Sequence, residues 1–278
     1  PDEVTYSAYL DMTRYQISNS GKTCFANLDG EDVIDCRIGA KDISLGFGVS
    51  DITADIIELK LMISGGALVN VGGTIQTTGS IGFETMKIQD PSFGVAVGKV
   101  ENYFWAHMSV IFESYKLTGG IFFGTSCTLE PLEIIDPEVA SLLSIDEMRG
   151  IFLSVSGNFP ILNYGCLLRV GVSAGVAMWY FADGPTFGGK IVAGAFGEAA
   201  CIVSVKGQLT LIGGKSAGKY FFKGNAWVGG GIGFCEPEDW NSPSDVSDDG
   251  WCASCVAVID LVYKNDDWSA DYDVDCSL

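Results

Sequence analysis

The stretch from Phe187 to Cys235, FGGKIVAGAFGEAACIVSVKGQLTLIGGKSAGKYFFKGNAWVGGGIGFC, decides how the rest of the chain is interpreted. Thirteen of its 49 residues are Gly, and most of the others are β-branched, aromatic or small. Apolar and Gly positions alternate with other small residues, and nothing recurs at helical spacing. This pattern is typical of long paired strands whose backbones pack closely. Because few of its side chains carry out chemistry, the stretch predicts a scaffold.

The same strand pattern continues toward the N-terminus. Apolar residues alternate from Ile43 to Phe83. Within this region, Asp51–Ser64 fits both helical and strand spacing, and its β-branched residues and the Gly pair that follows favour a strand. Turn signals recur about every 10 to 20 residues along the chain, which is typical of a meander rather than of βαβ units. The sequence therefore predicts an all-β protein, a large antiparallel meander forming a sandwich or a barrel-like sheet.

One short helix is predicted at residues 136–149, DPEVASLLSIDEMR. Asp136 is a suitable N-cap, Pro137 suits the first helical position, and Gly150 ends the segment. We expect residues 1–278 to form a single β-rich domain. The alternative is two β halves, 1–125 and 151–278, joined by this helix.

The charge of the chain is negative and uneven. The formal net charge is −19, yet residues 151–234 carry six basic and two acidic side chains. The acidity therefore lies in the flanking segments. A protein this acidic is repelled by nucleic acid and by anionic membrane surfaces. No run of about 18 apolar residues occurs, so we expect no transmembrane helix.

Nine cysteines favour an oxidising compartment, secreted or in the cell envelope. Cys24 and Cys36 bracket a plausible hairpin turn and are predicted to form a disulfide. Four more disulfide candidates cluster near the C-terminus: Cys235, Cys252, Cys255 and Cys276. Because the total is odd, at least one thiol is free or intermolecular. Since the chain begins at Pro1 rather than Met, we expect a mature or excised portion of a longer precursor.

The acidic loop Glu236–Gly250 is a candidate calcium site, through Asp245, Asp248 and Asp249. Calcium takes six to eight oxygen ligands from flexible loops, and this loop offers carboxylates and carbonyls. The spacing does not follow the EF-hand pattern, and a solvated loop is the competing interpretation. No other cofactor is expected.

Two stretches resemble catalytic motifs without their required context. Gly171–Gly175 matches G-x-S-x-G around Ser173, but a strand pattern follows it and the sole histidine, His107, lies upstream. Gly213–Lys219 is close to a P-loop, but Tyr220 replaces the magnesium-binding Ser or Thr and no helix follows. We therefore interpret the first as strand and the second as a hairpin turn.

These observations favour a non-enzymatic structural or adhesive β protein of the envelope or of a secreted compartment. We expect it to self-assemble or to bind another surface protein, since strand edges and an unpaired Cys suit assembly by strand addition. One alternative is a carrier that holds a lipid or other apolar ligand inside a β-barrel or open sheet. Another is a carbohydrate-active enzyme that uses a pair of carboxylates, but nothing in the sequence identifies which two acidic residues would form that pair.

A transmembrane outer-membrane barrel shares the acidity, the Gly content and the aromatic content of this chain. Nine cysteines argue against it, as does the C-terminal Cys-Ser-Leu where such barrels end in an aromatic residue.

Overall fold

A computed structural model describes most of the chain. It covers residues 7–16, 22–28, 32–46, 51–83, 86–112, 115–164, 167–182, 184–200, 202–233, 252–264 and 266–277. The predicted calcium ligands Asp245, Asp248 and Asp249 lie outside these ranges, as does Cys235.

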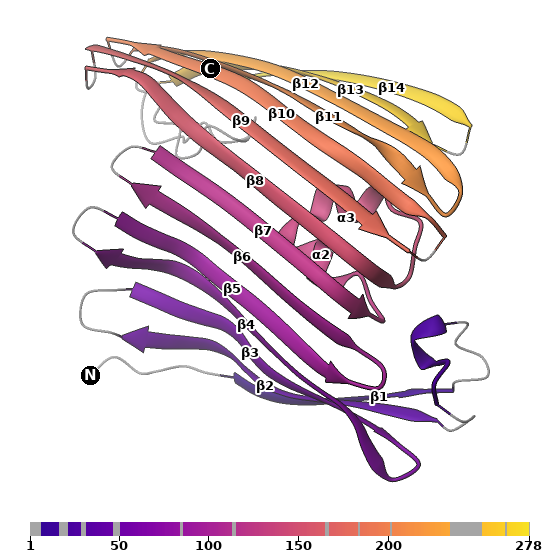
Figure 1. Ribbon diagram of the computed structural model, residues 1–278. Helices are drawn as coiled ribbons and strands as arrows, with labels where there is room; N and C mark the ends of the chain where they lie inside the picture. Colours follow the sequence, from indigo (N-terminus) through magenta and orange to yellow (C-terminus); the bar gives the residue numbers. More distant parts are fainter. Residues whose placement is uncertain are drawn as a thin grey trace. The chain divides into compact units, whose positions relative to one another are not determined.

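Fourteen antiparallel strands form a single sheet that is not closed, and their order in the sheet is their order in the chain (Figure 1). The predicted all-β antiparallel meander is confirmed, including the strand at Asp51–Ser64. The strands are β1 (Ser7–Tyr15), β2 (Val33–Gly46), β3 (Asp51–Ser64), β4 (Ala67–Phe83), β5 (Met86–Gly98), β6 (Asn102–Phe112), β7 (Tyr115–Ser126), β8 (Met148–Asn163), β9 (Leu168–Phe181), β10 (Thr186–Ala199), β11 (Val203–Ser216), β12 (Lys219–Gly233), β13 (Cys252–Lys264) and β14 (Asp267–Ser277).

The predicted helix at 136–149 is wrong in extent. Two short helices occur instead, α2 (Glu130–Ile135) and α3 (Pro137–Leu142), and a 3-10 turn, η1, covers Thr23–Phe25. Asp136 is the expected N-cap of α3, where its Oδ1 accepts a hydrogen bond from the Val139 N–H at 3.1 Å. The helix ends at Leu142, since Leu143 is extended.

The chain divides into two compact units. Unit 1 comprises 1–113, 118–154 and 179–186, and unit 2 comprises 114–117, 155–178 and 187–278. Strands β1 to β6 therefore belong to unit 1, and β10 to β14 belong to unit 2. Each unit is described separately below.

Unit 1 has an apolar cluster where the connection between β1 and β2 meets the end of β7. Its buried members are Cys24, Phe25, Val33, Met62, Val69, Val100 and Cys127. A second packed group joins β8 and β9, where the Phe152 and Trp179 rings stack with centroids 6.4 Å apart. Helix α2 packs directly on β7, because a Cβ added at Gly120 would lie 2.2 Å from Cγ2 of Ile135.

Unit 2 contains the Gly-rich stretch, and its strands β10 to β14 pair without register shifts. Strands β10 and β11 pair from Phe187–Lys215 to Ala199–Val203. Ala217 and Gly218 connect β11 to β12 with positive φ angles of 47° and 85°, as a two-residue hairpin turn requires. The interpretation of the P-loop-like segment as a hairpin is confirmed. Gly171–Gly175 lies within β9, where the strand continues past Ser173.

Candidate functional site

The two described disulfides correct one predicted pairing. Cys24 bonds Cys127, 103 residues away in the sequence, so the predicted Cys24–Cys36 bridge is wrong. Cys36 is the free cysteine among the described ones. The second bridge joins Cys255 to Cys276 across β13 and β14, whereas the side chain of Cys252 is not described. Two disulfides indicate an oxidising, extracytoplasmic environment.

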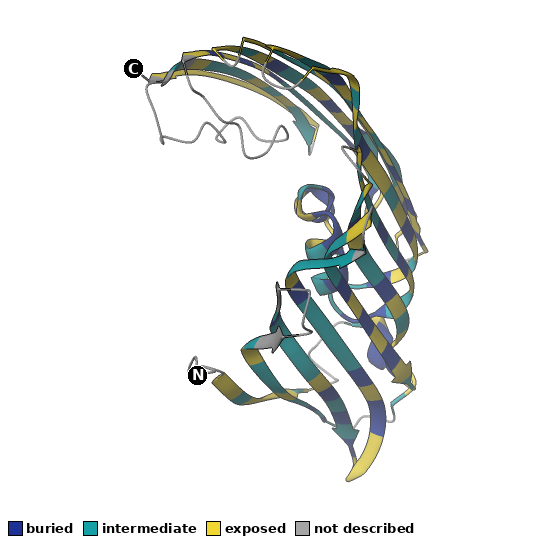
Figure 2. Ribbon diagram, turned by 90° about the vertical axis from the view of Figure 1, so that its left-hand side faces the viewer, coloured by how far each residue is buried: buried dark blue, intermediate teal, exposed yellow. Residues whose placement is uncertain are grey.

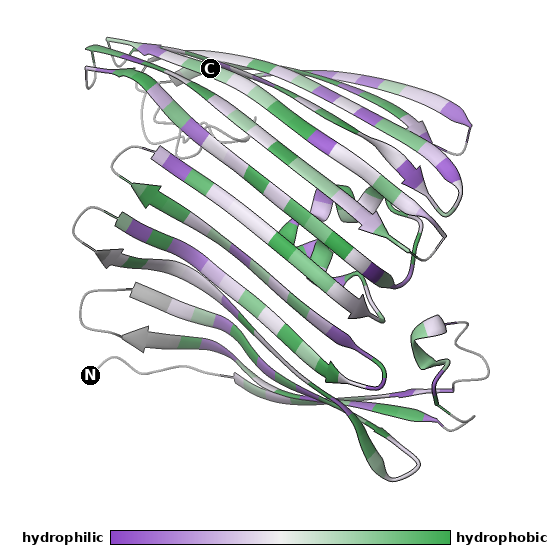
Figure 3. Cartoon of the chain, in the orientation of Figure 1, coloured by the Kyte–Doolittle hydropathy of each residue, from purple (hydrophilic) through white to green (hydrophobic). Residues whose placement is uncertain are grey.

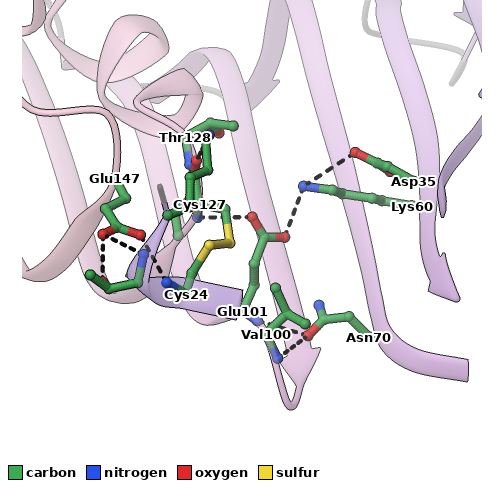
Figure 4. Close-up of a disulfide and its surroundings, with 12 residues drawn as sticks. Cys24, Asp35, Lys60, Asn70, Val100, Glu101, Cys127, Thr128 and Glu147 are labelled. Carbon is green, nitrogen blue, oxygen red and sulfur yellow. Dashed lines mark hydrogen bonds and ion pairs between the residues drawn. A yellow bond between two sulfur atoms is a disulfide. The ribbon is translucent and has the colours of Figure 1, made fainter. Parts of the chain in front are cut away.

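Disulfide Cys24–Cys127 borders a cluster of buried ionic side chains in unit 1 (Figure 4). Glu101 is fully buried, and its Oε2 accepts a hydrogen bond from Lys60 Nζ at 2.8 Å. Its Oε1 accepts from the Cys127 N–H at 3.1 Å. Lys60 Nζ also lies 3.9 Å from Oδ2 of Asp35. The Asp35 Oδ1 has no hydrogen-bond partner among the described residues, and burial raises the pKa of this carboxyl against the opposing charges of Lys60 and Arg37.

Arg37 extends this cluster to helix α2. Its Nη1 lies 3.2 Å from Oε2 of Glu130 and 3.6 Å from Oε1 of Glu58. Burial favours neutral Arg37, but Glu130, Asp35 and Glu58 outweigh it and raise the pKa of the guanidinium. Tyr9 donates a hydrogen bond to Oε2 of Glu58 at 2.7 Å, and burial together with this carboxylate raises the pKa of the Tyr9 phenol.

The six residues Asp35, Arg37, Glu58, Lys60, Glu101 and Glu130 are called the buried charge cluster below, after its buried members Asp35, Lys60 and Glu101; the other three are half-buried. They join strands β2 and β3, the start of β6 and helix α2, and the two cations, Arg37 and Lys60, lie between the four carboxylates. No group of three or more His, Cys, Asp or Glu side chains suited to a metal ion occurs within the described ranges. The geometry is that of a structural anchor for the helices.

The buried charge cluster lies on one face of the unit 1 sheet, and the opposite face is apolar apart from Arg14 near the end of β1. One row of paired residues crosses β1 to β6 through Leu10, Ile38, Leu59, Gly73, Val95 and Phe104. The adjacent row, one residue along each strand, is Asp11, Arg37, Lys60, Gly72, Ala96 and Tyr103. Successive side chains of a strand point to opposite faces, so the two rows lie on opposite faces.

The apolar face of unit 1 is exposed, which is the reverse of an ordinary globular sheet. Leu10 is 64% exposed and Val97 is 65% exposed, whereas Lys60 and Asp35 are buried. The exposed members of this face are Leu10, Met12, Ile38, Leu59, Val71, Phe93, Val95, Val97 and Phe104. Figures 2 and 3 show the resulting alternation of burial and hydropathy along the strands.

Unit 2 has the same arrangement on β10 to β14. One row crosses it through Ile191, Leu211, Gly224, Leu261 and Ala270. Lys215 is the one charged residue among the described positions of this face. Its large exposed side chains are Phe187, Ile191, Val203, Val205, Leu209, Leu211, Tyr220, Val228, Ile232, Ile259, Leu261, Trp268, Tyr272 and Val274. These residues are called the apolar face of unit 2.

Aromatic side chains gather at one end of this apolar face. Trp268 lies with its ring centroid 4.9 Å from that of Tyr263 and 6.3 Å from that of Phe222. At the same end, Lys215 Nζ lies 5.5 Å from the centroid of the Tyr220 ring. The aromatic rings and the Lys215 ammonium group therefore lie at the end of the face formed by the hairpin β11–β12 and the turn between β13 and β14.

The opposite face of unit 2 carries its charges. Arg169 Nη1 lies 3.4 Å from Oε2 of Glu198. Asp271, Asp273 and Asp275 share this face of β14, and Asp271 lies opposite Asp260. The amide of Asn225 donates to Oδ1 of Asp260 at 2.9 Å. In unit 1 the single histidine, His107, also lies on the charged face, where burial lowers its pKa.

Neither described α-helix, each six residues long, is long and apolar enough to cross a membrane. No protein-family model, no curated protein and no solved structure matches this chain.

Proposed function

We propose that the protein belongs to the cell envelope and that its apolar faces contact the hydrocarbon of a lipid bilayer. The observation that carries this proposal is the pair of exposed apolar faces, each backed by a face that holds the charges. Sheets that contact lipid carry apolar residues on the lipid side and polar residues on the other, in strict alternation.

The size of the apolar face supports this proposal. On β11 it runs from Val203 to Leu211, about 27 Å at 3.4 Å per residue. Five strands at about 4.8 Å spacing make it about 19 Å wide, on the order of 500 Å² in unit 2. That area reaches the upper range for the largest apolar patch of a soluble monomer. Covering it is worth on the order of 10 kcal/mol at about 25 cal/mol per Å².

Its chemistry favours lipid over a protein partner. Protein interfaces are only about 56–65% apolar and contain several hydrogen bonds. The apolar face of unit 2 offers hydroxyl or indole groups at Tyr220, Tyr263, Trp268 and Tyr272, three of them at one end. Trp and Tyr side chains concentrate where hydrocarbon meets the headgroups. A length of about 27 Å is close to the hydrocarbon thickness of roughly 30 Å.

The test is flotation of the purified protein with phosphatidylcholine vesicles. Wild-type protein is expected to float with the vesicles. A triple variant on the apolar face, Val205→Arg, Leu209→Arg and Ile259→Arg, is expected to stay at the bottom, because each Arg near the bilayer centre costs about 2–4 kcal/mol.

The matched control places the same three charges on the neighbouring residues of the opposite face, as Ser204→Arg, Gln208→Arg and Val258→Arg. This variant is expected to float like the wild type, and circular dichroism checks that both variants fold. A wild-type protein that does not float with the vesicles overturns the proposal. One lipid bound per chain without flotation would indicate the carrier role instead.

A further inference from the structure

The sheet ends at two strands that pair on one side within the described chain. Strand β14 pairs β13 from Ser254–Ser277 to Lys264–Asp267, and it is the last strand in the sheet order. Strand β1 pairs β2 from Ser7–Lys41 to Tyr15–Val33, and it is the first. Each strand therefore presents a row of backbone N–H and C=O groups at the edge of the sheet.

An open edge conflicts with the environment assigned to the apolar faces. Within hydrocarbon, an unpaired backbone group finds no water to bind, so spanning structures pair all of them. Strand β14 belongs to the lipid-facing surface, because Trp268, Tyr272 and Val274 lie on the apolar face and are 58%, 80% and 61% exposed. This step rests on the proposed function, and it requires a strand beside β14.

Strand β1 of a second copy can pair with β14, because its direction and its side chains fit. In a meander of fourteen antiparallel strands the first and last run in opposite directions, so β1 of a second copy beside β14 continues the antiparallel order. The apolar residues Ala8, Leu10 and Met12 of β1 then extend the row of Ala270, Tyr272 and Val274. On the other face Asp271 then lies opposite Asp11, while Asp273 and Asp275 lie opposite Tyr9 and Ser7.

Of the contact between β14 and β1 and the competing contact between two copies of β14, charge disfavours the second more strongly. That contact would place the carboxylates of Asp271, Asp273 and Asp275 beside their own copies, and like charges directly opposite are destabilising. The corresponding face of β1 carries Ser7, Tyr9, Thr13 and Tyr15, with Asp11 as its acid. Lys41 lies one strand further, opposite Ser7.

We propose that β14 of one copy pairs with β1 of a second copy, so that the copies assemble edge to edge through a continuous antiparallel sheet. The contact is head-to-tail, because it joins two different edges. Each copy then pairs both of its edge strands, whereas a contact between two β1 strands would leave β14 unpaired.

The test is photo-crosslinking of mixed copies in phosphatidylcholine vesicles. Equal amounts of unlabelled and heavy-isotope-labelled protein are mixed, with Tyr272 replaced by p-benzoylphenylalanine in the unlabelled copy. Mass spectrometry of the digest is expected to find the β14 peptide joined to a heavy-isotope peptide from Ser7–Tyr15. The control puts the same group at Tyr220, which is 66% exposed but away from both edges, and it is expected to lose this product.

The outcomes separate the two proposals. Flotation with cross-links to β14 of the second copy, to other segments or to none overturns the β14–β1 contact and leaves the lipid contact standing. Failure to float overturns the lipid contact. A β14–β1 cross-link confined to the unlabelled chain overturns the assembly.

Discussion

At the scale of single residues, the pair Lys60–Glu101 dominates the interior of unit 1. Both side chains are buried, and Glu101 additionally accepts the Cys127 N–H. A buried ion pair contributes little net stability, but removing one partner leaves an uncompensated charge. The pair therefore holds the start of β6 against the charged face of β3, across the two intervening strands β4 and β5.

Substituting Lys60→Met is expected to lower the free energy of unfolding by about 3–5 kcal/mol, because Glu101 is left buried without its cation. The double variant Lys60→Met with Glu101→Gln is expected to be less destabilised than the single one, since Gln still accepts from Cys127. Urea unfolding followed by tryptophan fluorescence measures both. Equal losses in the two variants would contradict this account of the pair.

Sequence alone could not have found this cluster. Nothing local in the sequence distinguishes Glu101 from the other acidic residues of the chain. Its partner Lys60 is 41 residues away, and Arg37 meets Glu130 across 93 residues. Such pairing depends on strand register, which propensity does not encode. The cap at Asp136 was predictable because a cap depends on residues within one turn.

At the scale of elements, the helix at 136–149 shows how tertiary contacts override a local pattern. The expected helix continued through Glu147 and Met148. In the structure Glu147 accepts hydrogen bonds from the N–H groups of Thr23 and Cys24, and Met148 starts β8 with its side chain fully buried. The segment after Leu142 is therefore extended toward contacts that lie more than 120 residues away in sequence.

The two disulfides differ in the length of chain that they close, and this difference predicts their effects. Cys24–Cys127 spans 103 residues and Cys255–Cys276 spans 21. On the loop-entropy relation they are worth about 4.7 and about 3.3 kcal/mol. Replacing both cysteines of a pair by Ala is expected to cost more stability for the first pair, as measured by thermal unfolding. A larger loss for the second pair would contradict this.

The strands themselves were predictable, but the orientation of their faces was not. The period of two identifies which residues share a face, and the register of β10 to β14 agrees with it. Which face is exposed depends on what covers each one. In unit 1 helix α2 packs on the face that carries the buried charge cluster. The residues that make this contact are far apart in the sequence.

In the molecule as a whole, each unit turns an apolar face outward, and the proposed lipid contact gives these faces a role. The net charge of −19 does not reveal the apolar faces, because the charged residues lie mainly on the opposite faces and in the flanking segments. The number of cysteines argues against a membrane protein. The separation of apolar and charged residues onto opposite faces of the strands instead supports a lipid contact.

The most direct test is electron paramagnetic resonance of spin labels along β11 in phosphatidylcholine vesicles, in a background where every free thiol found by titration, Cys36 among them, is replaced by Ser. Single labels replace each residue from Val203 to Ile212. The account predicts that labels at 203, 205, 207, 209 and 211 are accessible to oxygen, which dissolves in hydrocarbon, and protected from a water-soluble nickel complex. Labels at the even positions should lack this preference. Equal access of the nickel complex to both sets would contradict the lipid contact.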